Sequence, residues 1–289
     1  MVQKAVKHLN LFPIEHKMST QQHILITGAS GGLAESAVDL LTRNNCHVFA
    51  ADINPEVKVR YKDNPLVSAL VMDVTDPDAV TNAYDTVSAQ TRGLDAVIHM
   101  AAILVVGSVA ERPVEEVRNV LDVNLLGVYN VNKQFLPLVL NRKGRIIIIS
   151  SENARQTAAP FNGIYALSKY ALEAYSDALR RELSFLGVRV IKVRPGPFKT
   201  PMTRSTETLF ENAEKQSVLF KKNIARGAFY LPGVYRKARD PSILAKVILK
   251  IMKSSNPRTA YNIRHDIPRI LLELLPVRRA DALVKRVLG

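Results

Sequence analysis

The sequence lacks the features that mark secreted and membrane-spanning proteins. It contains one cysteine, Cys46, so an intramolecular disulfide is impossible and a reducing, cytoplasmic compartment is expected. Its longest apolar stretch, residues 97–110, is interrupted by His99 and Gly107 and is too short to span a bilayer. The N-terminal residues contain no continuous apolar core followed by small residues, so we predict no secretory signal.

Acidic residues are scarce in the last quarter of the chain. The formal net charge is +14 over 289 residues, and residues 215–289 hold 17 Lys and Arg against 4 Asp and Glu. The rest of the chain is therefore almost neutral. This distribution indicates a local basic surface with an anionic partner, and it does not favour a protein that binds nucleic acid.

The chain is predicted to form one domain with an extension at each end. A composition of 47% hydrophobic and 23% charged residues is typical of a globular protein with a sizeable core. Residues 1–17 differ in character from the rest of the chain, and we interpret them as a remnant of expression or a weak amphipathic arm before Met18. Residues 18–266 are predicted to form the domain, and residues 267–289 a basic amphipathic segment broken by Pro276.

Short apolar runs alternate with longer amphipathic ones along the domain. We predict strands at residues 23–27, 47–51, 66–72, 96–100, 145–150, 188–193 and 260–263. We predict helices at residues 32–43, 77–91, 113–140 (as two helices), 165–186 and 241–253. This alternation predicts an α/β fold with a doubly wound parallel sheet, the Rossmann arrangement, in a single domain. Residues from about 200 to about 240 are punctuated by Pro and Gly, and we expect them to form a substrate loop within a C-terminal lid.

A glycine-rich turn follows the first predicted strand and opens the first predicted helix. Glycines at this point permit a tight turn and let backbone N–H groups approach a pyrophosphate at the helix N-terminus. The alternative is an ordinary strand–helix turn, but the placement between strand and helix favours a dinucleotide site. The turn supplies five candidate cofactor-binding residues: Gly28, Ser30, Gly31, Gly32 and Leu33.

Two carboxylates end the next two predicted strands. Asp52 lies 24 residues after Gly28, where a carboxylate can accept hydrogen bonds from an adenosine ribose and would repel a 2′-phosphate. No Lys or Arg lies in the glycine turn or directly after Asp52, so we predict NAD as the cofactor and not NADP. Asp73 and its neighbour Val74 could contact the adenine, although Asp73 could equally be a turn or capping residue.

Tyr165 and Lys169 are four residues apart on a predicted helix, so they share one face. A nearby ammonium favours the phenolate and is expected to lower the tyrosine pKa, which would give a general acid/base that works near neutral pH. The spacing alone is common on solvated helices. It gains weight from Asn124 and Ser151 upstream.

The glycine turn, Asp52, Ser151 and the Tyr165/Lys169 pair together resemble the short-chain dehydrogenase/reductase family over about residues 20–200. The resemblance implies that Tyr165 transfers a proton to or from the substrate oxygen while a hydride moves to or from the nicotinamide. It implies that Lys169 lowers the Tyr165 pKa and holds the nicotinamide ribose, and that Ser151 hydrogen-bonds the substrate oxygen. Asn124 would position a water that connects Lys169 to solvent.

The same resemblance implies further cofactor contacts. Pro195 and Gly196 are similar to the turn that closes over the nicotinamide, and Thr200 would hold its carboxamide. Ala101 lies in the segment that follows the fourth predicted strand and is a further candidate. No metal ligand set is predicted. Taken singly, Ser151 could simply end a strand and Asn124 could cap a helix.

One segment departs from the pattern of the compact branch of this family. That branch often has Asn-Asn-Ala-Gly after the fourth strand, where this chain has His99-Met100-Ala101-Ala102, which looks more like the longer, epimerase-type branch. The sequence around Asn124 and the short chain after Gly196 favour the compact branch. Sugar-nucleotide epimerase or dehydratase activity, and an NAD-binding sensor or scaffold without turnover, are the alternatives. His99 is interpreted as a strand-end residue that faces the cofactor or a buried neighbour.

The helix after Tyr165 is similar to that of the retinol and hydroxysteroid dehydrogenase subgroup. This likeness implies NAD-dependent interconversion of a lipophilic secondary alcohol (steroid-, retinoid- or fatty-alcohol-like) and its ketone. Apolar residues in the variable segment agree with such a substrate or with simple lid packing: Met202, Leu209, Phe210, Leu219, Phe220, Phe229, Tyr230, Leu231 and Tyr235. Residues 267–289 could contact a membrane surface peripherally or serve as a lid. The family likeness also implies a homodimer or homotetramer formed through residues 113–140 and 165–186.

Overall fold

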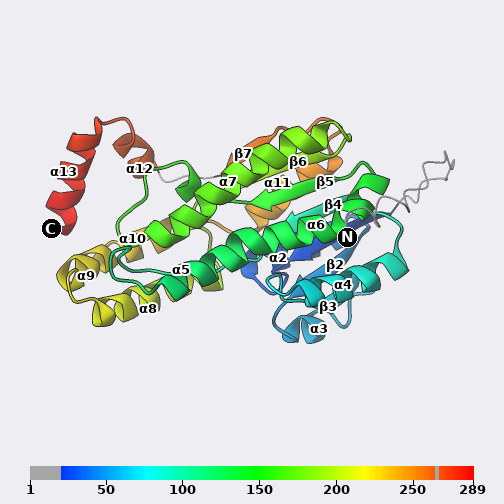
Figure 1. Ribbon diagram of the computed structural model, residues 1–289, viewed down its shortest axis with the longest axis horizontal. Coiled ribbons are helices and arrows are strands. Elements are labelled where there is room, and N and C mark those ends of the chain that lie inside the picture. Colours follow the sequence, from blue (N-terminus) through cyan, green and yellow to red (C-terminus); the bar gives the residue numbers. More distant parts are fainter. Residues whose placement is uncertain (1–20, 264–266) are drawn as a thin grey trace.

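The computed structural model describes residues 21–263 and 267–289, so the predicted extension at residues 1–17 lies outside the described residues. At its centre is a seven-stranded sheet in the order β3-β2-β1-β4-β5-β6-β7, and all the strand pairs are parallel (Figure 1). The strands span Gln22–Thr27 (β1), Cys46–Asp52 (β2), Val67–Val71 (β3), Ala96–His99 (β4), Arg145–Ile149 (β5), Arg189–Pro195 (β6) and Ala260–Ile263 (β7). The chain winds outward from β1 in one direction and from β4 in the other, which confirms the doubly wound prediction.

Helices cover both faces of this sheet (Figure 1). Alternation along the strands divides the apolar core: Ile24 and Ile26 of β1 pack in one layer, and Leu25 between them packs in the other. The first layer is completed by α2 (Gly32–Thr42) and α11 (Ser242–Lys253). The second is completed by α4 (Pro77–Gln90), α6 (Gly127–Asn141) and α7 (Gly163–Ser184). Because both faces are covered, the strands are nearly continuous apolar runs.

Two helical segments differ from their predictions. Residues 113–140 form one continuous helical run, in which a π-helical turn, η1 (Asp122–Leu126), joins α5 (Val114–Leu121) to α6. A short helix, α3 (Glu56–Arg60), follows β2 and was not predicted. Five residues give too few positions for an apolar period to be recognised.

The predicted loop from about residue 200 to about residue 240 is helical. It contains α8 (Pro201–Gln216), α9 (Lys221–Phe229) and α10 (Leu231–Lys237). Thr200 caps α8 by accepting the N–H of Thr203 at 3.2 Å, and Pro201 occupies the first turn, where it costs no hydrogen bond. The prediction was wrong because the Pro and Gly residues were taken as breaks, whereas they flank or enter short helices.

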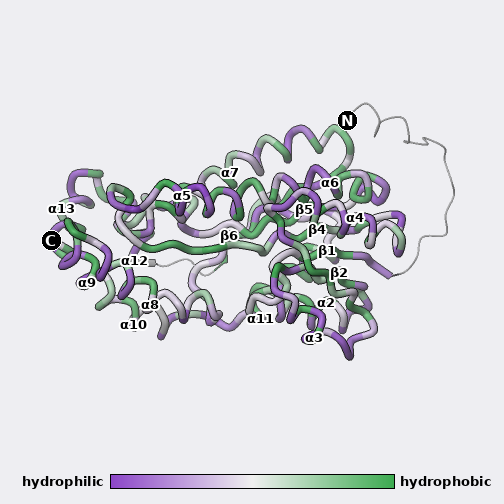
Figure 2. The backbone as a smooth tube through the Cα atoms, turned by 60° about the horizontal axis from the view of Figure 1, so that its bottom comes forward, coloured by the Kyte–Doolittle hydropathy of each residue, from purple (hydrophilic) through white to green (hydrophobic). Residues whose placement is uncertain are grey.

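The C-terminal residues form two helices, α12 (Ile267–Leu272) and α13 (Val277–Leu288), on either side of Pro276 as predicted. Both views place α8, α9, α10 and α13 together at one end of the molecule, away from the sheet (Figures 1 and 2). They surround a small apolar cluster of Val106, Phe161, Ala213 and Ile224, against which Leu288 packs. The Asn223 amide donates to the Leu288 carbonyl at 2.7 Å and ties α13 to α9.

A buried ionic network fastens α7 to the edge of the sheet. The Glu173 carboxylate accepts two hydrogen bonds from the Arg194 guanidinium, at 2.8 and 2.6 Å. The Lys192 ammonium lies 2.9 Å from the same carboxylate and 2.7 Å from that of Asp177. Arg194 and Lys192 belong to β6, so this pairing fixes the position of the helix that carries Tyr165.

Candidate active site

The glycine turn lies where β1 and β4 leave the sheet side by side. Gly28 has a φ of +70°, which disfavours any residue with a side chain. A Cβ at this position would lie 2.6 Å from the Ala101 backbone nitrogen. The Thr27 hydroxyl accepts the N–H groups of Met100 and Ala101, both at 3.3 Å, and so holds the two segments together. Gly28 is therefore required both by its conformation and by the close approach of Ala101.

The N-terminus of α2 is open to an anionic ligand. Gly31 is its N-cap and makes no side-chain cap hydrogen bond, so the first N–H groups of the helix can approach a phosphate. A Cβ at Gly32 would lie 3.0 Å from the Pro201 ring at the start of α8. Within the described residues, the Ser30 hydroxyl is buried without a hydrogen-bond partner. A glycine cradle and an orphaned hydroxyl at a helix N-terminus fit a pyrophosphate.

Asp52 shapes the same turn from the end of β2. Its two carboxylate oxygens accept the N–H of Ser30 at 2.8 Å and the N–H of Asn54 at 2.9 Å. Each oxygen has two lone pairs, so the carboxylate can still accept from a ribose hydroxyl. Asp73 also makes local hydrogen bonds. One of its carboxylate oxygens accepts both the backbone N–H and the hydroxyl of Thr75, each at 2.8 Å.

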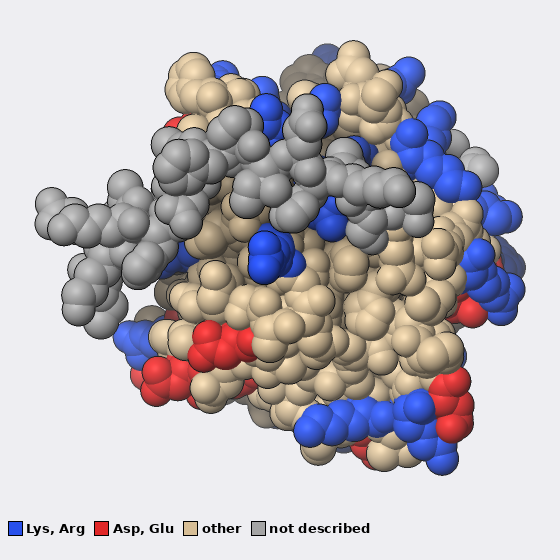
Figure 3. Space-filling view, turned by 90° about the vertical axis from the view of Figure 1, so that its right-hand side faces the viewer, with Lys and Arg blue, Asp and Glu red and all other residues tan. Residues whose placement is uncertain are grey.

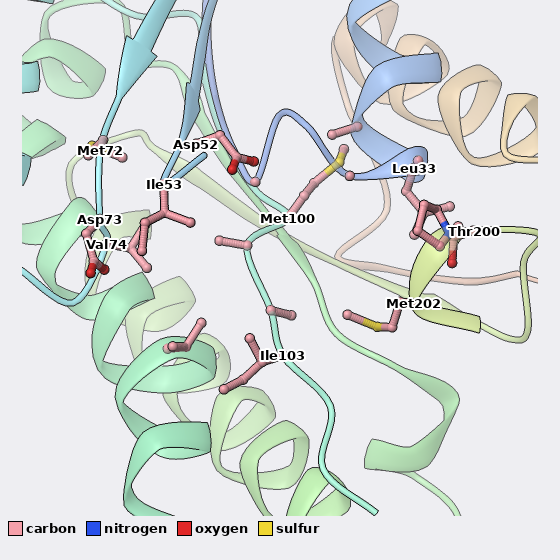
Figure 4. A pocket seen from close by; sticks show the side chains of 18 residues that line it. Leu33, Asp52, Ile53, Met72, Asp73, Val74, Met100, Ile103, Thr200 and Met202 are labelled. Atoms are coloured by element: carbon pink, nitrogen blue, oxygen red, sulfur yellow. The ribbon is translucent and has the colours of Figure 1, made fainter. Parts of the chain in front are cut away.

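A cavity of about 300 Å³ runs along this edge of the sheet (Figure 4). Nine predicted cofactor residues line it: Gly28, Gly31, Gly32, Leu33, Asp52, Asp73, Val74, Ala101 and Thr200. The wall also contains Met202, which the sequence indicated for the substrate, and side chains that sequence reasoning missed: Ile53, Met72, Met100, Ile103 and Val123. Ile53 and Met72 each adjoin a predicted carboxylate, and that position is the signal that could have indicated them. Five other predicted cofactor residues are not among its lining residues: Ser30, Tyr165, Lys169, Pro195 and Gly196.

Lys169 and Tyr165 lie together on the inner face of α7. The Lys169 ammonium is buried, donates to the Ile149 carbonyl at 3.3 Å and lies 5.6 Å from the centre of the Tyr165 ring. Ile149 is the last residue of β5, so this bond places the pair at the carboxyl edge of the sheet. The spacing of four residues thus brings the two side chains together, as the sequence predicts.

The pKa values of this pair differ from the expectation. Burial raises the pKa of Tyr165 to about 12, although a hydrogen bond from Ser151 lowers it in part. Burial also lowers the pKa of Lys169 to about 8. Removal of charge from water is the largest cause of both shifts, and the expected lowering of the Tyr165 pKa by Lys169 is not found. The protonated phenol is therefore the favoured form in this structure, and Lys169 is the group of the pair that titrates near neutral pH.

Ser151 directly follows β5 and caps a short 3₁₀ helix, η2 (Glu152–Ala154). Its hydroxyl oxygen accepts the backbone N–H of Asn153 at 3.1 Å and the side-chain amide of Asn153 at 3.4 Å. Both lone pairs are then used, so the Ser151 hydroxyl acts as a donor, and in this structure Tyr165 is its partner. Its interaction with Tyr165 brings Ser151, Tyr165 and Lys169 into one site.

Asn124 lies fully buried in the π-helical turn η1. Its amide accepts the N–H of Ile103 at 2.8 Å and donates to the Ile103 carbonyl at 3.0 Å and to the Ser168 hydroxyl at 3.0 Å. It therefore holds the segment after β4 against α7. Its role in positioning a water stays a prediction.

Pro195 and Gly196 follow at the end of β6. The Gly196 N–H donates to the Ile263 carbonyl at 2.8 Å, which extends the β6–β7 pairing by one residue. Thr200 is four residues further on, and its hydroxyl caps α8 at the rim of the cavity. The turn therefore leads directly from the sheet to the lid helices.

His99 does not belong to this site. Its ring is hydrogen-bonded to the Asn132 side-chain oxygen at 2.8 Å, and the Asn132 amide donates to the Tyr175 hydroxyl at 3.1 Å. Burial lowers the pKa of His99 to about 4, so the ring is neutral at pH 7. The prediction that His99 faces a buried neighbour is confirmed.

The model of the short chain dehydrogenase family matches residues 22–209, which include the cavity, Ser151 and the Tyr165/Lys169 pair. The chain belongs to the short-chain dehydrogenase/reductase family. A probable short-chain type dehydrogenase/reductase of Helicobacter pylori is 31% identical and covers 91% of this chain and 96% of its own. Retinol dehydrogenase 7 of Rattus norvegicus is 32% identical, and the match covers 91% of this chain and 87% of the relative. The likeness to the retinol and hydroxysteroid dehydrogenase subgroup is confirmed.

A solved short-chain dehydrogenase from Streptomyces avermitilis has the same fold, with a TM-score of 0.73 at 21% identity, covering 93% of this chain and 98% of its own. Members of the family bind a nicotinamide dinucleotide, which the glycine cradle fits. Across residues 21–263 and 267–289, no cluster of His, Cys, Asp and Glu is suited to hold a metal ion. In the same residues, no helix has the length and apolar character needed to cross a bilayer.

Substitution of His99 tests its assignment as a neutral structural residue. His99 takes up a proton near pH 6.5 when unfolded but only near pH 4 when folded, so stability is lost as pH falls between these values. We expect the free energy of unfolding of the native chain to fall by about 2 kcal/mol more than that of His99→Met between about pH 7.5 and about pH 5. Urea unfolding at the two pH values measures both, and equal losses would contradict the assignment.

Proposed function

We propose that this short-chain dehydrogenase interconverts a lipophilic secondary alcohol and its ketone with NAD. The observation that carries the proposal is the grouping of Ser151, Tyr165 and Lys169 at the same sheet edge as the dinucleotide cavity. A sensor that only binds NAD would need the cavity but not a half-buried phenol and a buried ammonium at the same edge of the sheet. These side chains supply what the transfer of a hydride requires at the substrate oxygen, namely a proton and a hydrogen-bond donor.

The cofactor, when bound, accepts or returns the hydride at its nicotinamide ring. Tyr165 is protonated at neutral pH, so it can give its proton to the oxygen of a ketone as that oxygen gains charge. In the opposite direction Tyr165 must first lose its own proton, so that the phenolate can accept the proton of the alcohol. The Lys169 side chain, with a pKa of about 8, is the neighbouring group that can take up and release protons near neutral pH. Ser151 donates a hydrogen bond to the same substrate oxygen.

The residues that would hold the cofactor are those of the cradle and the cavity wall. The N-terminus of α2 and Ser30 would take the pyrophosphate, and Asp52 the adenosine ribose. A 2′-phosphate would meet a carboxylate that is already fixed by two backbone N–H groups. Thr200, Pro195 and Gly196 would close over the nicotinamide. This arrangement supports NAD over NADP.

An apolar lid supports a lipophilic substrate. Val106 and Phe161 come from the loops beside β4 and Ser151, and they form a cluster with Ala213 of α8 and Ile224 of α9. Leu209, Phe210 and Phe220, which the sequence indicated for the substrate, pack against this cluster. A ligand that reaches Tyr165 from the lid side would pass apolar side chains. A relative named as a retinol dehydrogenase agrees with such a substrate.

The C-terminal helices support a peripheral contact with an anionic membrane. They expose apolar side chains at Leu271, Leu274, Val277 and Leu283. Arg278, Arg279, Lys285 and Arg286 lie among them, and α13 has no fully buried residue. The opposite end of the molecule differs, because it shows acidic groups among its lysines and arginines around a mostly uncharged surface (Figure 3). An apolar surface with basic neighbours is suited to the interface of a lipid bilayer.

Pairing of two chains is also proposed. Leu126 and Tyr129, where η1 meets α6, and Leu167 and Tyr170 on α7 are exposed apolar or aromatic side chains on the helices predicted to pair. Their exposure on neighbouring helices supports a homodimer, or a homotetramer built from it.

The activity is tested with Tyr165→Phe. We expect the native chain to reduce NAD with a lipophilic alcohol from a panel of a hydroxysteroid with a secondary hydroxyl group and a long-chain secondary alcohol. Tyr165→Phe should bind NAD with unchanged affinity in calorimetry but lose about a thousandfold or more in kcat/KM, because the phenolic proton is removed. Unchanged turnover would overturn the role of Tyr165. NAD binding without turnover of any alcohol by the native chain would favour the sensor.

Substitution of Asp52 tests the predicted preference for NAD over NADP. We expect NAD to bind the native chain about tenfold or more tightly than NADP, because the carboxylate repels a 2′-phosphate. Asp52→Asn should bring the affinities for NAD and NADP closer together. Its amide oxygen still accepts the N–H of Ser30 or Asn54. Fluorescence titration with both nucleotides measures the ratio. Tighter binding of NADP by the native chain would refute the assignment.

The membrane contact is tested by flotation with two kinds of vesicle, phosphatidylcholine alone and with phosphatidylserine. We expect the native chain to float with the anionic vesicles, and Arg278→Glu/Arg279→Glu to float much less, since attraction becomes repulsion. Lys58→Glu/Lys62→Glu near α3 changes the net charge equally at another exposed site and serves as the control. Equal flotation of the two variants would dismiss a contact through α13.

A further inference from the structure

The loop after Ser151 is hydrogen-bonded to the C-terminal helix α12 and to the residue that directly follows this helix. Arg269 of α12 donates to the Asn153 side-chain oxygen at 2.6 Å and reaches the Thr157 carbonyl at 3.4 Å. Glu273, one turn later, accepts the Thr157 N–H at 2.8 Å and the Thr157 hydroxyl at 3.0 Å. Two charged side chains thus hold both ends of residues 153–157.

The same loop is held from the other side by the catalytic helix. The Tyr170 hydroxyl of α7 donates to the Gln156 carbonyl at 2.9 Å. Residues 153–157 therefore lie between α7, which carries Tyr165 and Lys169, and α12, more than a hundred residues further along the chain. Contacts with two separate elements limit the positions that this loop can take.

The contact of Arg269 with Asn153 leads directly to the catalytic hydroxyl. A guanidinium can only donate, so the side-chain oxygen of Asn153 must face Arg269 and its NH₂ group must face away. That NH₂ group is the donor 3.4 Å from the Ser151 hydroxyl oxygen, next to the donating backbone N–H of Asn153. With its lone pairs taken by these two donors, the Ser151 hydroxyl can act as a donor toward the substrate oxygen.

We propose that Arg269 and Asn153 are positioning residues, which act through Ser151 and set its hydroxyl as a hydrogen-bond donor, with Glu273 holding the loop in register. The proposal rests on the proposed function of Ser151. It gives residues 267–273 a part in the reaction beyond a lid or a membrane contact. Arg269 itself touches neither the cofactor cavity nor Tyr165 in the contacts described.

Asn153→Asp separates the two contacts of Asn153. The carboxylate keeps its pairing with Arg269 but offers no donor to Ser151, and it would draw the Ser151 proton toward itself. We expect kcat to fall by about tenfold or more while KM changes little, because the lost interaction belongs to the transition state. In alcohol oxidation the rise of the rate with pH should also move to higher pH, since Ser151 no longer stabilises the Tyr165 phenolate that accepts the proton. An unchanged kcat and pH profile would overturn the proposal.

Arg269→Ala is the second variant, and a double-mutant cycle shows whether it acts through Ser151. We expect about a tenfold loss of kcat in the native background, a smaller loss in Arg269→Lys, and no further loss in a Ser151→Ala background. The assay uses the panel alcohol with the highest native kcat/KM. Arg43→Ala is the control, because Arg43 is an exposed residue directly after the C-terminus of α2. If the losses of kcat caused by Arg269→Ala and by Ser151→Ala multiply in the double variant, this would contradict action through Ser151.

Amide hydrogen exchange gives a readout that does not depend on turnover. We expect residues 152–157 to exchange about tenfold or more faster in Arg269→Ala and in Glu273→Ala than in the native chain or Arg43→Ala. Unchanged exchange would overturn the proposal even if no alcohol is turned over. If exchange is faster in these variants but the native chain turns over no alcohol, the proposed function is refuted. The contacts of Arg269 and Glu273 would then be structural only, and the positioning role would be rejected as well.

Discussion

Burial of one face of α7 is the constraint on which the rest of the site depends. Lys169 is buried and Tyr165 is half-buried, and this partial or full removal from water raises the pKa of the phenol to about 12 and lowers that of the ammonium to about 8. A buried ammonium is costly, so its neighbours must be fixed to keep it there. The Ile149 carbonyl accepts from it, and the Glu173 network anchors the same helix to β6. The chemistry then depends on position more than on an intrinsically acidic tyrosine.

The two halves of the site are joined by backbone contacts at the carboxyl edge of the sheet. Gly28 allows the first turn to lie against Ala101, and Asn124 pins the next residues, at Ile103, to the helix beside α7. Thr27 and Asn124 therefore hold residues 100–103, which line the cofactor cavity, against β1 and against the helix that carries Tyr165. A shift of this segment would change the cofactor cradle.

Periodicity was sufficient to predict the sheet, because its strands are buried on both faces and its helices are long. The Gly28 turn, Asp52 and the Tyr165/Lys169 spacing were also found from sequence, since each depends on local geometry. The helical lid was missed because α9 and α10 are short and because the Pro and Gly residues of this segment were read as breaks, although Pro201 lies in the first turn of α8. The pKa of Tyr165 was wrong in sign, because burial is a property of the whole fold. The Arg269–Asn153 contact joins residues 116 positions apart, and no pattern in the sequence marks it.

The central claim is that this site transfers a hydride directly between a lipophilic alcohol and the nicotinamide while Tyr165 and Ser151 serve the oxygen. The most direct measurement traces a deuterium label from the carbinol carbon of the alcohol with mass spectrometry of the recovered nucleotide. The account predicts that the label is retained on the nicotinamide ring, with a primary isotope effect on kcat/KM. Label found in water, or nucleotide reduced without label, would contradict it.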